Sequence, residues 1–309
     1  MGATFWDFDM TLTPGAKGVL ALIGACTVWG LSPLYYHLLA HVPPLEVQSY
    51  RTLWSLIFFA GLLAAQGRLG EVAAALAAPR TLMVIVGAAV MISLNWYGFI
   101  YSISIGNALE ASLGYYMFPL VAVVLGWLVF RERLSRAQVA AVVLAALAVV
   151  VLTAGLGVAP WIALFLAGTF GAYGVLKKGL DLGGVVSVTA EVAVLAPFAL
   201  LWLVFRGTAI GAHAVDWSDM ALLTFSGLLT GLPLIMFSYA ARRVRLSTVG
   251  LVQYLNPTLQ FGCAVLFFGN VLTPWHVIAF PVIWSALALY SLSSFRADRA
   301  ARRRVQPLA

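Results

Sequence analysis

The chain alternates long apolar runs with short polar segments, and this pattern predicts helices that cross a membrane. Each run holds about 20 residues, the length that an α-helix needs to span a hydrocarbon core of about 30 Å. The runs lack the alternation of a membrane β-barrel, so we expect each backbone to satisfy its hydrogen bonds within a helix. The predicted all-α membrane protein has ten spans, at residues 18–40, 47–66, 81–104, 109–130, 136–153, 159–178, 186–205, 219–241, 247–268 and 274–294.

Two segments of the chain repeat each other at a shift of 138 positions. Residues 109–137 and 247–275 both have small or hydroxyl side chains among their first six positions and then carry Tyr–x–x–Pro. The shift places Tyr116 on Tyr254 and Pro119 on Pro257. A weaker match pairs Trp29-Gly30 with Tyr173-Gly174 at a shift of 144.

The repeat divides the ten spans into two sets of five. Because five is odd, the second set enters the membrane in the opposite direction to the first, which is the inverted repeat of many secondary transporters. We therefore expect a five-helix repeat at 18–153, a second at 159–294, an N-terminal tail at 1–17 and a basic tail at 295–309.

The distribution of positive charge predicts the orientation. If the N-terminus is cytoplasmic, all but two of the 18 Lys and Arg lie in cytoplasmic segments, and the exceptions are Arg51 and Arg206. Positive residues favour the cytoplasmic side, so both termini are expected there. The net charge of +7 thus lies in short connections and a tail, where it contacts anionic lipid headgroups, and no nucleic-acid binding is expected.

Composition and motifs exclude several other classes. Only 9% of residues are charged, against about 25% in soluble domains. No phosphate-binding Gly–x–x–x–x–Gly–Lys sequence is present, which excludes an ATP-driven pump, and no cofactor or enzyme site is predicted. Cys26 and Cys263 lie within spans and are interpreted as packing residues, and the histidines lack metal-ligand spacing. Residues 1–17 lack the apolar core of a cleaved signal, so the first span is expected to be retained.

Several motifs resemble those of the RarD branch of the EamA drug/metabolite transporters. They are VWGLSPLYY at 28–36, SYRTLWS at 49–55, SLNWYGFIYS at 93–102, LEASLGYY at 109–116 followed by Pro119, FRERLSRAQ at 130–138 and RLSTVGLVQYLNPT at 245–258. The resemblance covers nearly all ten spans. It implies transport of small organic molecules across the bacterial cytoplasmic membrane, in a branch associated by name with chloramphenicol sensitivity. The chain departs from the family at Gly269-Asn270, where a Gly–Glu is typical.

Polar and aromatic side chains within the spans are the candidate substrate ligands, since such residues usually face the protein interior or a wet cavity. Gln253, Asn256 and Gln260 fall on one face of the ninth span. The alternatives are helix–helix hydrogen bonds and a structural kink at each proline. The predicted substrate-binding residues are Asn95, Trp96, Tyr97, Tyr116, Pro119, Gln253, Tyr254, Asn256, Pro257 and Gln260.

Three charged residues within or at the ends of spans are candidates for ion pairing or coupling. Arg51 and Glu191 occupy similar places in the two halves, and they form an ion pair, or Arg51 binds a substrate carboxylate, or each reaches its nearer interface. Glu110, at the outer end of the fourth span, is the candidate for proton coupling. The alternative for Glu110 is a charge that complements the helix dipole.

These features predict a secondary transporter that exports a small organic metabolite or drug-like molecule by alternating access. The alternatives are a proton-coupled cation or multidrug exporter and a membrane receptor or scaffold without transport. The expected partners are a small-molecule substrate, membrane lipids and, as a candidate coupling ion, protons. A monomer and a homodimer both remain open.

Overall fold

The computed structural model describes residues 13–131, 134–157, 159–178, 180–208, 216–244 and 246–305. The predicted tails at 1–17 and 295–309 therefore lie partly outside the described residues. Within these ranges all regular structure is helical. The elements are α1 (Pro14–Leu38), α2 (Pro44–Ala65), α3 (Leu69–Ala77), α4 (Pro79–Ser104), α5 (Ala108–Phe130), α6 (Arg136–Leu156), α7 (Trp161–Lys178), α8 (Gly184–Thr208), α9 (Trp217–Ala241), α10 (Leu246–Gln253), α11 (Leu255–Gly262), the π-helix η1 (Cys263–Phe267) and α12 (Pro274–Val305).

Among the described residues, seven helices are individually long and apolar enough to cross a membrane: α1, α4, α5, α6, α8, α9 and α12. Helix α2 meets the same criterion only together with α3, from which it is bent by 115°. Helix α7 has 18 residues and ends in Lys177 and Lys178, and α10 and α11 have eight residues each. The structure thus supports a multi-pass membrane protein with seven or eight candidate spans, while each of the ten predicted ranges is largely helical.

The ninth predicted span, 247–268, is not one continuous helix. It is divided into α10, α11 and η1, with a break at Tyr254. Pro257 explains the break, because proline has no N–H to donate to the carbonyl of Gln253 and its ring collides with that carbonyl. Pro119, its counterpart in the repeat, lies inside the continuous helix α5.

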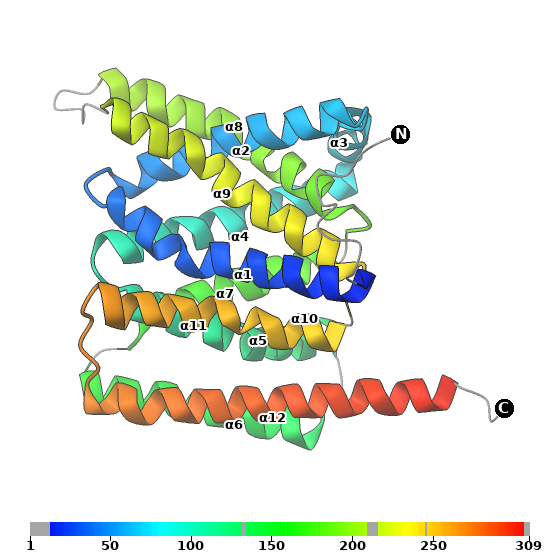
Figure 1. Ribbon diagram of the computed structural model, residues 1–309, viewed down its shortest axis with the longest axis vertical. Coiled ribbons are helices and arrows are strands. Elements are labelled where there is room, and N and C mark those ends of the chain that lie inside the picture. Colours follow the sequence, from blue (N-terminus) through cyan, green and yellow to red (C-terminus); the bar gives the residue numbers. More distant parts are fainter. Residues whose placement is uncertain are drawn as a thin grey trace.

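The helices lie side by side, with the start of α1 and the end of α12 at the same end of the bundle (Figure 1). Helices α6 and α12 pack together along one edge. At the opposite edge α2 packs against α8 and α9. Helix α1 lies in the middle of the bundle and packs against α9 and α11. Helices α4, α5 and α7 contact one another. Helices of the first half therefore pack directly on a helix of the second half.

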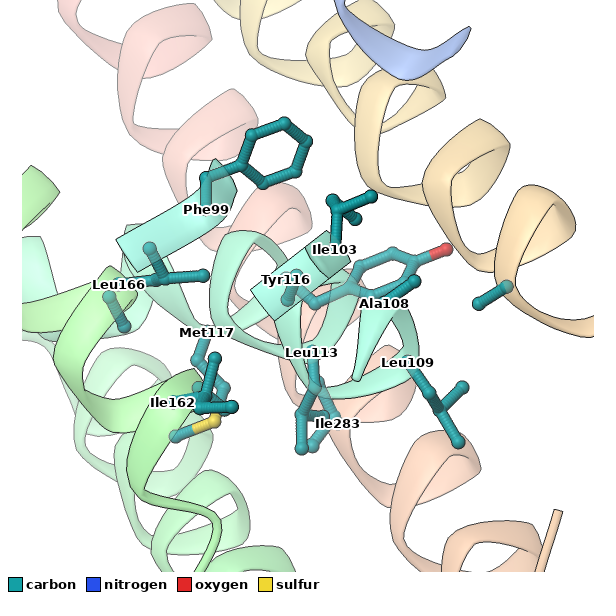
Figure 2. Packing of buried hydrophobic residues seen from close by; sticks show 14 of the residues in the cluster. Phe99, Ile103, Ala108, Leu109, Leu113, Tyr116, Met117, Ile162, Leu166 and Ile283 are labelled. Atoms are coloured by element: carbon teal, nitrogen blue, oxygen red, sulfur yellow. The ribbon is translucent and has the colours of Figure 1, made fainter. Parts of the chain in front are cut away.

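The largest apolar core forms where α4, α5, α7 and α12 meet. Figure 2 shows Leu113 and Met117 of α5 beside Ile162 of α7 and Ile283 of α12. Gly114 allows the α5–α7 contact, because a Cβ there would stand 2.8 Å from the carbonyl oxygen of Ala163.

Local signals set the boundary between α5 and α6, which hydropathy alone divides poorly. Helix α5 ends at Phe130, and the following residue, Arg131, caps it with a left-handed φ of 53°. Helix α6 begins with a capping box, in which the hydroxyl of Ser135 accepts from the N–H of Gln138 at 3.2 Å. The side chain of Gln138 in turn accepts from the N–H of Ser135 at 2.8 Å, so that two otherwise unpaired donors are satisfied.

Candidate substrate site

Arg51 is buried between α1, α2, α4 and α9. Its Nε donates a hydrogen bond of 2.9 Å to the hydroxyl of Thr230 on α9. The guanidinium carbon lies 4.0 Å from the ring centre of Trp96 on α4 and 5.8 Å from that of Tyr36 on α1. The side chain therefore packs on aromatic faces inside the bundle and does not reach for an interface.

Asn95, the residue before Trp96, joins three helices. Its amide nitrogen donates to the carbonyl of Leu166 at 2.9 Å and to the hydroxyl of Thr169 at 3.1 Å, both on α7. Its amide oxygen accepts a hydrogen bond of 3.0 Å from the hydroxyl of Tyr115 on α5. In this conformation Asn95 joins α4, α5 and α7 through hydrogen bonds. Helix–helix hydrogen bonding was one of the alternatives for the polar residues within the spans.

A row of aromatic rings extends from Arg51 through the interior. Tyr36 meets Phe99 at a centroid distance of 5.9 Å, and Phe99 meets Tyr115 at 5.8 Å. Tyr115 meets Phe170 at 6.0 Å, and Phe170 stacks on Tyr173 at 6.0 Å. We call Tyr36, Phe99, Tyr115, Phe170 and Tyr173 the aromatic row.

The other end of the aromatic row reaches a buried ion pair. The hydroxyl of Tyr173 donates to Glu191 at 3.1 Å, and the Nζ of Lys177 lies 2.6 Å from the other carboxylate oxygen. Ser187 also donates to Glu191, at 2.9 Å, and accepts from Lys177. Glu191 thus pairs with Lys177 rather than with Arg51, since an acid only 1% exposed requires a partner within reach.

Gln253, Asn256 and Gln260 were predicted to share one face of the ninth span, and two of these side chains bond to each other. The amide nitrogen of Gln260 donates to the side-chain oxygen of Asn256 at 2.9 Å, whereas the amide oxygen of Gln260 is buried without a partner. The backbone of Asn256 lies against Gly30 of α1, where a Cβ would stand 3.0 Å from the Asn256 carbonyl oxygen. Gln253 lies at the break before α11.

Tyr116 and Tyr254, the paired tyrosines of the repeat, line one pocket of about 760 Å³ between α5, α10–α11 and α12. The hydroxyl of Tyr116 lies 2.8 Å from that of Thr258 on α11, and its ring is seen in Figure 2. The hydroxyl of Tyr254 accepts from Ser291 of α12 at 3.4 Å. Leu251 and Leu292, each more than half exposed, also line the pocket, so it opens toward the outside of the bundle. We call it the lateral pocket.

The remaining candidates lie apart from both groups. Tyr97 stacks on Tyr101, on α4, at a centroid distance of 6.1 Å. Glu110 lies in the first turn of α5, where its Oε2 is buried without a hydrogen-bond partner.

Most of the predicted residues therefore fall into two separate groups, and Tyr97 and Glu110 lie outside both. Arg51, Trp96 and Asn95 lie at or beside the aromatic row, and Tyr116 and Tyr254 line the lateral pocket. Sequence reasoning missed Lys177 as the partner of Glu191 and Trp284 as part of the lateral pocket. Lys177 lies 14 positions before Glu191 and on a different helix, so no short-range spacing pointed to their contact.

Comparison with known proteins defines the class. Residues 16–154 match the EamA-like transporter family. Protein RarD of Streptomyces exfoliatus is 42% identical over 94% of this chain and 93% of its own length. A chloramphenicol-sensitive protein RarD of Pseudomonas aeruginosa is 30% identical over 93% of this chain and 98% of its own length. A crystal structure at 18% identity shares the fold, with a TM-score of 0.58 over 91% of this chain and 98% of that one.

The chain belongs to the RarD branch of the EamA-like transporter family. It is a multi-pass protein of the bacterial cytoplasmic membrane. The family points to a transporter rather than an enzyme, with a small-molecule substrate and a lipid environment.

Proposed function

We propose that this protein is a secondary transporter that exports a small organic molecule across the cytoplasmic membrane by alternating access. In this proposal ten spans form two inverted repeats, at 18–153 and 159–294, and both termini are cytoplasmic. Inverted halves provide two equivalent conformations that open to opposite sides of the membrane.

The observation that carries the proposal is that helix contacts are exchanged between the halves. Helix α1 packs on α9 and α11, and its counterpart α7 packs on α4 and α5. Helix α2 packs on α9, and its counterpart α8 packs on α4. Helices α2 and α8 pack on each other, as do α6 and α12. This pattern is what a two-fold relation between the halves requires.

Glycine contacts support the same relation, and they favour a different register in the first helix of each half. A Cβ at Gly30 would stand 2.6 Å from the side chain of Leu259, and one at Gly171 would stand 3.1 Å from that of Val121. Val121 and Leu259 are equivalent at the shift of 138, so Gly30 corresponds to Gly171. A Cβ at Gly174, the match from sequence, would meet nothing within 4 Å.

The ends of the repeated helix agree with this alignment. Arg131 and Gly269 are equivalent at the shift of 138, and both have a left-handed φ, of 53° and 64°. The next residue in the second half, Asn270, donates to the carbonyl of Gly106 at 2.9 Å and accepts from the N–H of Leu109 at 3.3 Å. An amide therefore joins the two halves where the family carries an acid.

The substrate route in this proposal follows the aromatic row between Arg51 and the Lys177–Glu191 pair, and the lateral pocket gives an apolar molecule access from the bilayer. Gln253 and Tyr254 lie at the break beside that pocket. The name of the Pseudomonas aeruginosa relative makes chloramphenicol one compound to test. For coupling we propose Glu110, because its buried Oε2 without a partner would be stabilised by a proton.

A counterflow experiment tests the function. Purified protein is reconstituted into vesicles loaded with an unlabelled compound, and uptake of the labelled compound is followed for chloramphenicol, amino acids and amines. We expect saturable exchange of at least one compound, lost in Gln253→Ala and Tyr254→Ala and retained in Trp217→Ala, whose ring is 91% exposed. Exchange equal to that of protein-free vesicles for every compound would contradict the proposal.

A further inference from the structure

We infer that Arg51 is the binding site for a carboxylate, and that the transported molecule is a small organic acid with an apolar or aromatic body. The organic-acid substrate rests on the proposed transport function. The carboxylate site rests on the surroundings of Arg51 alone.

The first observation is a buried positive charge for which no ion pair is found among the described residues. Arg51 is 7% exposed, and arginine stays protonated in proteins. The ion pairs identified between described residues include His41–Asp219, Arg68–Glu71 and Lys177–Glu191, and none of these involves Arg51. Because burying an uncompensated charge is costly, the site favours an anion from outside the chain.

The second observation is how the guanidinium is held. Thr230 accepts from Nε, and its own hydroxyl donates to the carbonyl of Ser226 at 3.0 Å, which fixes the orientation of the acceptor. Trp96 and Tyr36 contact the guanidinium through their rings. These contacts leave Nη1 and Nη2 without a hydrogen bond to any described residue, and a planar carboxylate matches this pair of donors.

The third observation is a second polar group nearby. Gln48 lies one turn before Arg51 on α2, is 4% exposed, and has neither its amide oxygen nor its amide nitrogen hydrogen-bonded. A buried amide with both atoms unpaired is costly in a folded protein, and a ligand with an acidic head would satisfy its N–H donors. Tyr36, which contacts the guanidinium of Arg51, continues into Phe99 and Tyr115 of the aromatic row, and these rings supply an apolar surface that begins at Arg51.

Matched pairs of compounds test the carboxylate site. Thermal unfolding of the purified full chain in lipid nanodiscs is followed with benzoate, octanoate and indole-3-acetate, each beside its neutral amide and its amine analogue. We expect at least one acid to raise the unfolding midpoint and to bind at least 10-fold more tightly than its amide, whereas the amines have no effect. Equal binding of acids and amides, or no binding of any acid, would overturn the inference without recourse to a variant.

Variants then assign the binding to Arg51. Arg51→Gln should weaken acid binding at least 10-fold, and Arg51→Lys should weaken it by less, because the charge remains and the paired donors are lost. Arg68→Gln, which removes an exposed guanidinium on the same half, should leave binding unchanged. Unchanged acid binding in a folded Arg51→Gln protein would overturn the assignment.

Counterflow with the same compounds separates this inference from the proposed function. Exchange of an acid that Arg51→Gln abolishes supports both. Acid binding through Arg51 without exchange of any compound supports the carboxylate site and contradicts transport. Exchange of amides or amines that persists in Arg51→Gln supports transport and overturns the organic-acid substrate.

Discussion

Arg51 and Glu191 lie at similar places in α2 and α8, yet their charges are accommodated differently. Glu191 has an opposite charge and two hydroxyl donors around it, whereas Arg51 has two aromatic rings and one hydroxyl acceptor. The sequence identified both residues, because charge within an apolar run is expensive. It did not reveal their partners, because these come from helices that approach only in the folded bundle.

Removing Lys177 should expose how strongly Glu191 depends on it. We expect Lys177→Gln to lower the free energy of unfolding by about 3 kcal/mol, since a buried carboxylate loses its counter-charge. The double variant Lys177→Gln/Glu191→Gln should recover most of this loss, because no unpaired charge remains. Unfolding in mixed micelles measures both, and Lys17→Gln serves as a control. Equal losses in the single and double variants would contradict this account of the pair.

Helices were predictable wherever an apolar run is long, and less so where the chain breaks or shortens. The predicted start at residue 136 coincides with that of α6, because Ser135 and Gln138 form a capping box. The nine-residue helix α3 was not predicted, since it is too short to span, yet Val72 and Ala75 bury its apolar face. A structural kink was one alternative for both repeated prolines, yet the helix is interrupted only near Pro257 and not at Pro119.

The break at Tyr254 gives a prediction for the element that contains it. In Pro257→Ala the new N–H can donate to the Gln253 carbonyl, and α10 and α11 should join into one helix. We expect slower amide hydrogen exchange across residues 250–258 and slower counterflow, because the break beside the lateral pocket is lost. Pro119→Ala should change exchange in α5 little, since that helix is already continuous. Unaltered exchange at 250–258 would show that Pro257 does not cause the break.

The arrangement of the whole bundle was predictable only through the repeat. Parity gave the inverted relation between halves, but which helices touch depends on surface shape, such as the close contacts at Gly30 and Gly171. The same limit explains why the sequence could not assign the ten predicted site residues to separate groups. Periodicity shows that Tyr116 and Asn95 face inward, but not that Tyr116 faces α11 and α12 while Asn95 faces α7.

The central claim is that the two halves expose the interior to opposite sides in turn. Distances between pairs of spin labels test it most directly, in a protein whose buried Cys26 and Cys263 are replaced by alanine. One pair, at Ile105 and Val271, reports the end of the bundle where Asn270 joins the halves. The other pair, at Gln66 and Asp181, reports the opposite end.

In vesicles that show counterflow, we expect two distance populations for each pair. A transported compound on one side should shift the two pairs in opposite directions, so that one end opens as the other closes. A single distance for each pair, unchanged by the compound in vesicles that are exchanging it, would contradict alternating access.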